Sequence, residues 1–327
     1  MNDYNLLSEN FLYFFLYLYR IGFVIVTPTI CVIGLILNII CFIVCLRLKE
    51  KIFFYLAFKL LAELIYLMCG AISPYIFCED CHLEYTYLRA IVTLIINKYT
   101  KGVVYTLITL LEIEISFSRY YLLNSHSNKT IVEKKDKLKV IIHTLISLTI
   151  FVPYVFGHEI KKEQKEVFFF MFIDEYKLEY NKFGNSVYFY YFYTYFGFFE
   201  NILSILILIP LNIIIFIKFK KFINNKAKIP STIARQQENA KSEKRFTKMM
   251  VLISSLFIIS RLAEASALFF SLYNYYVVLM DYFEMYLIIL NIFVETSTYL
   301  MFSLNFFILF FLNKTFRHKF KQTFCLK

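Results

Sequence analysis

Seven long apolar stretches, separated by shorter polar segments, dominate the pattern of this 327-residue chain. Each stretch reaches about the 20 residues that a helix needs to cross the hydrocarbon core of a membrane. The stretches are continuous and lack the polar–apolar alternation of barrel strands, so we expect helices. The predicted spans are 22–46, 53–77, 92–121, 138–157, 187–217, 245–272 and 284–312.

The two ends of this pattern need separate comment. The segment from Phe11 to Leu46 is apolar almost throughout, which leaves the start of the first span poorly defined. A signal-like stretch before Arg20 is the alternative, but it has no basic region at its start. After the last span, residues 314–323 alternate basic and aromatic side chains, which predicts an amphipathic helix on the membrane surface.

The composition agrees with a helical membrane protein. Hydrophobic residues make up 59% of the chain and charged residues 18%, and the mean hydropathy is +0.60. Soluble domains contain roughly 45–50% apolar and about 25% charged residues. The low count of 7 Gly and 5 Pro also excludes collagen and loop-rich folds. The expected fold class is therefore an all-α membrane protein, a seven-transmembrane helix bundle with a short C-terminal amphipathic helix.

Lysine and arginine are distributed unevenly between the two sides of the predicted bundle. Of the 35 basic residues, 23 fall on the side of the 218–248 loop and the tail, and 8 on the other side. Because cytoplasmic loops carry such an excess, we predict an extracellular N-terminus (1–21), a bundle (22–312) and a cytoplasmic helix and tail (313–327) in the plasma membrane. The net charge of +11 then reflects contact with anionic membrane lipid, and nucleic acid is not needed as a partner.

Ionisable residues inside the predicted spans are the first candidates for function, because charge is costly in a membrane. Lys59 and Glu63 are four residues apart and Arg261 and Glu264 three, so each pair shares a helix face. The alternative for each pair is mutual neutralisation that only specifies packing. No catalytic constellation, metal cluster or cofactor motif is present, so an enzyme is not expected. The ionisable residues within the spans are Lys59, Glu63, Glu112, Glu114, Arg119, Glu200, Arg261, Glu264 and Glu295.

Short motifs occur in a fixed order over six of the seven spans. The sixth span carries EKRFTKMMVLISSLF at 243–257, and the third carries Arg119 and Tyr120 in ISFSRYYLL. Together these motifs resemble the rhodopsin-like G-protein-coupled receptors, whose sixth helix has an EKxxT(R/K)M…F run and whose third has a (D/E)RY motif. Further matches are Gly34 and Asn38 in the first span, LLAEL at 60–64 in the second, Pro210 in the fifth, and Asn305 and Phe316 near the end.

The chain departs from this family at several positions. Ser118 replaces the acid before Arg119, and Leu309 stands where the family has a tyrosine. The family's CWxP motif is replaced by SRLA at 260–263, so the toggle tryptophan and the kink proline are both missing; the chain contains no tryptophan at all.

The cysteines also depart from the family pattern. The 158–186 loop contains no cysteine, so the usual disulfide between the third helix and that loop cannot form. Cys78 and Cys81 lie together in the first outer loop, where they pair with each other, pair with another chain, or stay free. A zinc site is not expected, because no second CxxC pair exists. Cys325, beside the tail helix, is a candidate for palmitoylation, with a free thiol as the alternative.

The resemblance implies a receptor that binds an extracellular ligand and activates a heterotrimeric G protein by a shift between conformational states. The chain end is similar to that of invertebrate neuropeptide receptors of the FMRFamide type, which favours a neuropeptide ligand. The missing toggle residues and disulfide favour the alternative, a divergent chemosensory receptor for small molecules. From another class, a ligand-gated channel of inverted topology is the rival, but the charge distribution opposes its orientation.

The resemblance also assigns residues to the two inner parts of such a receptor. Arg119, Tyr120, Glu243 and Thr247 would form the switch for G-protein coupling, in which Glu243 holds Arg119 in the resting state. The residues of the polar core would be Asn38, Glu63 and Asn305. The carboxylate of Glu63 leaves a sodium ion as an option at that position.

At the outer end, the resemblance places Lys101 at the primary ligand-contact position of the third helix. Lys101 lies about 27 Å from Arg119 along the same helix. Glu295 and Tyr299 would line the seventh-helix side, and we assign Arg261 and Glu264 to the same ligand pocket. Lys101 would pair with Glu295 in the empty receptor or receive an anionic group from the ligand, and it argues against a cationic amine. The alternative is that Lys101 extends to the outer membrane interface.

Overall fold

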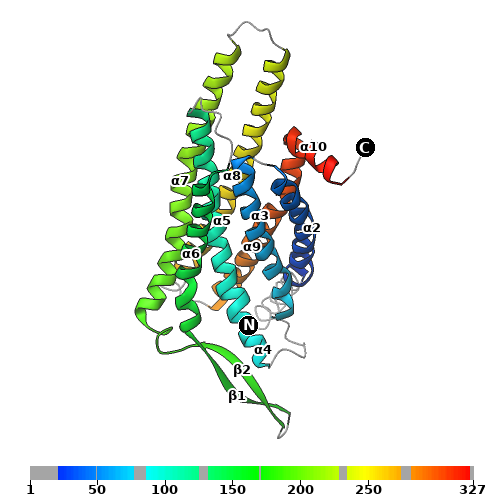
Figure 1. Cartoon of the computed structure of the whole chain (residues 1–327). Helices are drawn as coiled ribbons and strands as arrows, with labels where there is room; N and C mark the ends of the chain where they lie inside the picture. Colours follow the sequence, from blue (N-terminus) through cyan, green and yellow to red (C-terminus); the bar gives the residue numbers. More distant parts are fainter. Residues whose placement is uncertain are drawn as a thin grey trace, which may run out of the picture.

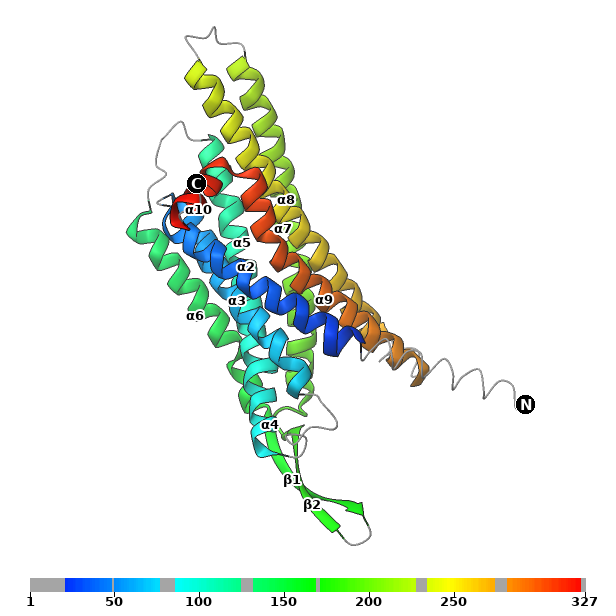
Figure 2. The same ribbon diagram turned by 90° about the vertical axis from the view of Figure 1, so that its right-hand side faces the viewer.

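The computed structural model describes residues 21–48, 50–76, 86–124, 132–168, 171–227, 234–273 and 281–324. Within this part of the chain, seven helices are long and apolar enough to cross a membrane. They form one bundle, and the predicted fold class is confirmed (Figures 1 and 2). In chain order the helices are η1–α2 (Ile21–Val26, Thr27–Leu46), α3 (Lys51–Ile76), α4–η2–α5 (Tyr87–Val92, Thr93–Thr100, Lys101–Asn124), α6 (Lys134–Phe156), α7 (Val187–Ala227), α8 (Ala234–Tyr273) and α9 (Asp281–Leu312).

The predicted tail helix is present as α10 (Lys314–Thr323). It begins where the Asn313 side chain accepts a hydrogen bond from the Phe316 backbone nitrogen at 2.9 Å. Phe316 is fully buried, and α10 packs on α2 and α9, which anchors the helix across one end of the bundle. We call this end of the bundle the tail end.

The opposite end carries a β-hairpin and is called the hairpin end (Figure 1). Strands β1 (His158–Phe168) and β2 (Met171–Tyr180) pair in antiparallel register, and β1 begins two residues after α6 ends. On its surface Lys161 binds Glu179 at 2.6 Å, and Lys177 binds Glu163 at 2.8 Å. The sequence predicted only a loop over 158–186, because these strands are polar on both faces and show no apolar alternation.

The surface and the interior of the bundle have the reverse of the usual polarity. Ile33, Ile36, Phe216 and Ile217 are more than half exposed on the outer faces of α2 and α7. By contrast, charged residues such as Lys59 and Glu63 are fully buried between helices. Lipid solvates apolar surface while inward charges avoid it, so the protein is a multi-pass membrane protein.

Helix contacts place α3 and α5 at the centre of the bundle. Helix α2 packs on α3 and α9, α5 packs on α3, α6 and α7, and α8 packs on α7 and α9. At Gly34 the approach of α2 to its neighbours is so close that a Cβ atom there would collide with the Ser303 side chain and approach Leu67 to 3.2 Å. Gly34, which belongs to the motif noted in the first span, therefore allows α2 to pack closely against its neighbours.

Helices α7 and α8 are longer than the sequence predicted. They reach about ten residues further into the 218–248 segment, which was expected to be a loop, and they project beyond the other helices at the tail end (Figures 1 and 2). The helical parts of this segment, 218–227 and 234–244, are polar but contain no Gly or Pro, so the backbone hydrogen bonding continues once the helices leave the membrane-spanning region.

Candidate functional site

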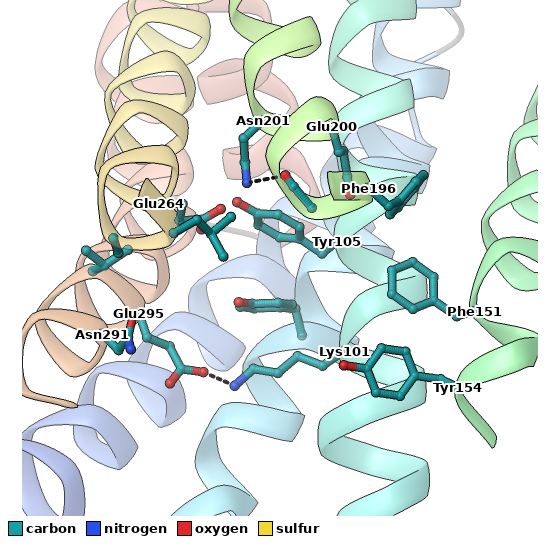
Figure 3. A pocket seen from close by; sticks show the side chains of 15 residues that line it. Lys101, Tyr105, Phe151, Tyr154, Phe196, Glu200, Asn201, Glu264, Asn291 and Glu295 are labelled. Atoms are coloured by element: carbon teal, nitrogen blue, oxygen red, sulfur yellow. Dashed lines mark hydrogen bonds and ion pairs between the residues drawn. The ribbon is translucent and has the colours of Figure 1, made fainter. Parts of the chain in front are cut away.

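A pocket of about 410 Å³ opens within the hairpin-end half of the bundle. Tyr154, two residues before the end of α6, forms part of its wall, which places the pocket near the base of the hairpin. Sites for small ligands fall in the range of roughly 300–1,000 Å³ and combine apolar walls with a few polar groups. The charged and aromatic lining residues are Tyr66, Lys101, Tyr105, Phe151, Tyr154, Phe196, Glu200, Glu264 and Glu295 (Figure 3).

Lys101 and Glu295 form an ion pair across this pocket, from α5 to α9 (Figure 3). The Tyr299 hydroxyl donates a hydrogen bond to the same carboxylate at 2.8 Å, and Tyr299 itself is buried outside the pocket wall. The Lys101 ammonium also lies 5.5 Å from the ring centre of Tyr66 and 5.4 Å from that of Tyr299. Lys101 therefore turns into the bundle instead of reaching the interface, and its side chain is only 16% exposed.

A π-helical segment directly precedes Lys101. Residues 93–100 form the π-helix η2, and Lys101 is the first residue of the α-helix that follows. The wider turns of a π-helix are often found at functional sites, since they redirect the side chains near them. In η2, the Asn97 side chain accepts a hydrogen bond from Ser73 of α3 at 2.8 Å, which ties this segment to the bundle.

Arg261 of α8 is fully buried beneath the pocket. Its guanidinium donates to the Asn201 side chain at 3.1 Å, to the Tyr105 carbonyl at 3.3 Å and to the Thr109 hydroxyl. The guanidinium carbon also stacks 3.4 Å from the centre of the Tyr105 ring. Residues of α5 and α7 thus hold the plane of Arg261 in a fixed orientation, which a flexible ammonium would not provide.

Two pocket carboxylates share Arg261. One guanidinium nitrogen lies 3.6 Å from Glu264 and 4.0 Å from Glu200. Glu264 accepts a hydrogen bond from Thr298 at 3.0 Å, and Glu200 accepts one from Thr109 at 3.3 Å. The Arg261–Glu264 pair expected from their spacing is present, and Glu200 joins it from a different helix.

The base of the hairpin borders the pocket wall at His158. The imidazole stacks on Tyr154 with ring centres 5.3 Å apart, and lies 4.5 Å from the ring centre of Tyr180. Its Nδ1 lies 2.7 Å from the Tyr154 carbonyl oxygen, which can only accept, so Nδ1 is the protonated nitrogen. Burial lowers the pKa of His158 below its usual value, which favours the neutral imidazole at this position.

A second buried charge network lies deeper in the bundle. The Lys59 ammonium contacts Glu112 of α5 at 2.6 Å and Glu63 of its own helix at 3.4 Å. Ser254 donates to Glu112 at 2.5 Å, and the Asn305 amide donates to Glu63 at 2.7 Å. The sequence suggested only the Lys59–Glu63 pair, but the closer partner of Lys59 is Glu112.

This arrangement bears on the sodium ion suggested at Glu63. The Lys59 ammonium occupies the space between the carboxylates of Glu63 and Glu112, where it supplies the positive charge that a metal ion would bring. Within the described part of the chain, no cluster of three or more acidic, His or Cys side chains is suited to a metal. The residues present therefore do not fit a sodium ion at this position.

Phe257 of α8 connects the two networks. Its ring is buried, with the Arg261 guanidinium carbon 4.7 Å from the ring centre on the pocket side and the Lys59 ammonium 5.6 Å from it on the deeper side. A movement of Arg261 would therefore displace the Phe257 ring, which lies beside the Lys59 ammonium. Sequence analysis used Phe257 only as the end of a motif and gave no hint of this contact.

The other residues of the predicted polar core and switch lie apart from one another. Asn38 of α2 is fully buried, and its amide makes no hydrogen bond to a described residue. Arg119 is buried near the tail end of α5, two turns beyond Glu112 and under the influence of its charge. Tyr120 is half-buried, and the Lys218 ammonium of α7 lies 4.1 Å from its ring centre.

Several predicted site residues fall outside the described parts of the chain. Glu243 and Thr247 belong to α8, but their side chains are not among those that the structure describes. The Arg119–Glu243 contact therefore stays a prediction. Cys78, Cys81 and Cys325 also lie outside the described residues.

Most of the pocket's aromatic wall was not predicted. Tyr105 lies one turn after Lys101, a spacing that could have found it, but Phe151, Tyr154 and Phe196 come from other helices. In a chain with 39 Phe and 27 Tyr, residue type alone does not single them out. Glu200 was noted as a buried charge, and only the structure places it in the pocket.

The fold and the pocket together define a multi-pass membrane protein with a seven-helix bundle, an architecture that fits a membrane receptor. A comparison with models of known protein families and with curated proteins finds no match.

Proposed function

We propose that the chain is a rhodopsin-like G-protein-coupled receptor, with its hairpin end extracellular and its tail end cytoplasmic in the plasma membrane. An extracellular ligand binds in the hairpin-end pocket, and a heterotrimeric G protein binds at the tail end. The observation that carries the proposal is that buried charges from α5, α7, α8 and α9 converge on one pocket, and that Phe257 joins them to a second buried network.

The contacts suggest how a ligand would act. A ligand that alters the Arg261 cluster acts on α8, because Arg261 and Phe257 belong to that helix, whereas one that alters the Lys101–Glu295 pair acts on α5 and α9. A ligand shifts the equilibrium only as far as it binds one state better than the other. Arg119 and Glu243, the predicted switch, would separate as α8 moves, and open the tail end for the G protein.

Two kinds of ligand have support. The charged hairpin beside the pocket offers further polar surface to a neuropeptide, in agreement with the resemblance to neuropeptide receptors. The pocket volume of about 410 Å³ is sufficient by itself for a small molecule, so a chemosensory receptor is the second candidate.

Nucleotide exchange tests the proposal without a known ligand. Membranes from cells that express the chain are mixed with purified G proteins of each Gα class, and binding of a non-hydrolysable GTP analogue is measured. We expect Glu243→Ala to raise basal exchange and Arg119→Ala to lower it, with hairpin variant Glu163→Gln as the unchanged control. If no form of the chain stimulates any G protein above empty membranes, the receptor proposal is wrong.

Epitope tags on each terminus of the chain, probed with antibody on intact cells, provide the second arm of this test. A receptor exposes the amino-terminal tag to antibody and hides the carboxyl-terminal tag. A channel of inverted topology shows the opposite pattern. Unchanged basal exchange in Glu243→Ala, in a chain that otherwise couples, would refute the Arg119–Glu243 contact alone.

A further inference from the structure

We propose that the hairpin-end pocket takes an organic cation, an ammonium or guanidinium group attached to an apolar or aromatic body. The inference deepens the proposed receptor function, on which it rests for its biological meaning. It reverses the expectation, drawn from Lys101 alone, that a cationic amine is disfavoured.

The first step is the charge of the pocket. Among the described side chains, its lining contains three carboxylates, those of Glu200, Glu264 and Glu295, but only one basic group, Lys101. Arg261 adds a second positive charge from beneath. With all five groups ionised, they carry one negative charge in excess. A buried charge without a counter-charge is costly, and a bound cation would remove that cost.

The second step is where the excess lies. Lys101 pairs with Glu295, whereas Glu200 and Glu264 both depend on the single guanidinium of Arg261. The distances from Arg261 to these two carboxylates are 4.0 and 3.6 Å, at the long end for an ion pair. The uncompensated charge is therefore on the α7–α8 side of the pocket, between Glu200 and Glu264.

An anionic ligand is opposed by the same contacts. To bind Lys101 it would have to displace Glu295, and the displaced carboxylate would join two others in the same cavity. Lys98, one turn before Lys101, is exposed and does not line the pocket. His158 lies outside the lining, and its lowered pKa keeps it neutral. Neither group offsets the excess.

The remaining wall suits the body of the ligand. Figure 3 shows Glu264 and Glu295 on one side of the pocket and Phe151, Tyr154 and Phe196 on the other. Aromatic faces attract cations and pack against apolar groups. A ligand with a cation at one end and an apolar body at the other would thus contact both walls.

Binding of small probes to the purified full-length chain in lipid nanodiscs tests the charge. The free probes share a phenethyl body and differ at its end: phenethylguanidinium is cationic, phenethylurea is its neutral isostere, and 3-phenylpropanoate is anionic. A peptide source of the cation is tested with acetyl-Ala-Arg-Ala-amide against the same peptide with neutral citrulline. We expect the cationic member of a pair to bind at least about tenfold more tightly than its neutral isostere. A preference shown only by the free probes identifies a small molecule as the source of the cation, and one shown only by the peptides identifies a peptide.

Pocket variants separate this charge effect from a loss of folding. Glu264→Gln keeps the hydrogen bond from Thr298 but removes the excess charge, so it should weaken cation binding at least about tenfold. Lys101→Gln adds to the excess and should strengthen it, a direction that misfolding would not produce. Lys135→Gln, at an exposed position near the start of α6 and away from the hairpin, should leave it unchanged. Tighter binding of the anion, equal binding of the isosteres, or no binding of any probe overturns the inference.

The nucleotide-exchange assay keeps the two proposals apart. Cation binding without stimulation of any G protein would leave this inference standing and refute the receptor function. Basal G-protein coupling in a chain that prefers the anionic probe would support the receptor function and refute this inference.

Discussion

The two buried charge networks solve the same physical problem in different ways. In the deeper network, Lys59 contacts both Glu63 and Glu112, and Ser254 and Asn305 donate further hydrogen bonds to these carboxylates. In the hairpin-end pocket, two cations face three carboxylates beside a cavity. The first network is closed by direct contacts between buried side chains, as a part that specifies packing should be. The second is open and incomplete, as expected of a site that a ligand completes.

The largest effect should come from removing the only cation between two buried carboxylates. We expect Lys59→Met to lower the free energy of unfolding by about 3–5 kcal/mol, because Glu63 and Glu112 would be left facing each other. Thermal unfolding can be followed with a thiol-reactive dye, since Cys31, Cys41, Cys45 and Cys69 are free and buried. Adding Glu112→Gln should restore part of the loss; if the double variant is less stable than the single one, the network is misassigned.

A smaller effect is expected from a change of shape without a change of charge. Arg261→Lys keeps the positive charge near Glu264 but loses the planar group that binds Asn201, Thr109 and the Tyr105 ring. We expect a loss of about 2 kcal/mol in the free energy of unfolding, measured with the same dye. A fully stable Arg261→Lys would mean that the charge alone matters at this position.

The pair at the pocket should be weaker still. Lys101 and Glu295 are 16% and 32% exposed, so solvent screens part of their attraction. A double-mutant cycle with Lys101→Gln and Glu295→Gln should give a coupling free energy of about 1 kcal/mol in unfolding. A coupling as large as that of Lys59 with Glu112 would remove the distinction between an open and a closed network.

The smallest effect is expected outside the membrane. The hydrogen bond from Lys177 lowers the pKa of Glu163 on the hairpin surface, so the pair stabilises the fold above the usual carboxyl pKa and this contribution disappears as the pH falls through the lowered value. Because both side chains are solvated, Glu163→Gln should not measurably change the unfolding midpoint at neutral pH. A clear shift would show that the hairpin is coupled to the bundle.

The sequence predicts the parts of this fold that depend on one helix at a time. All seven spans and the tail helix follow from continuous apolar runs and from one basic–aromatic segment. The hairpin could not be predicted in this way, because residues such as Lys161 and Glu163 give no apolar pattern. The helical ends of α7 and α8 were missed because polar sequence outside the membrane can be helix or loop.

The site shows the same division. Lys59 and Glu63 share a helix face, so their spacing is visible in the sequence. The rotation of α5 relative to α3, which brings Glu112 even closer to Lys59, is set by packing over whole helices and is not written in any local spacing. The contact between Lys101 and Glu295 was anticipated only as one of three options, for the same reason.

The projection of α7 and α8 beyond the bundle has a mechanical consequence. Helix α8 contains no proline and runs unbroken from Ala234 to Tyr273, so it can turn as a stiff rod about its contact at Phe257. The arm from Phe257 to Ala234 is about 35 Å long, and a tilt of about 10° there would displace its far end by about 6 Å. Without a proline hinge, α8 can thus still amplify a small motion, through leverage instead of bending.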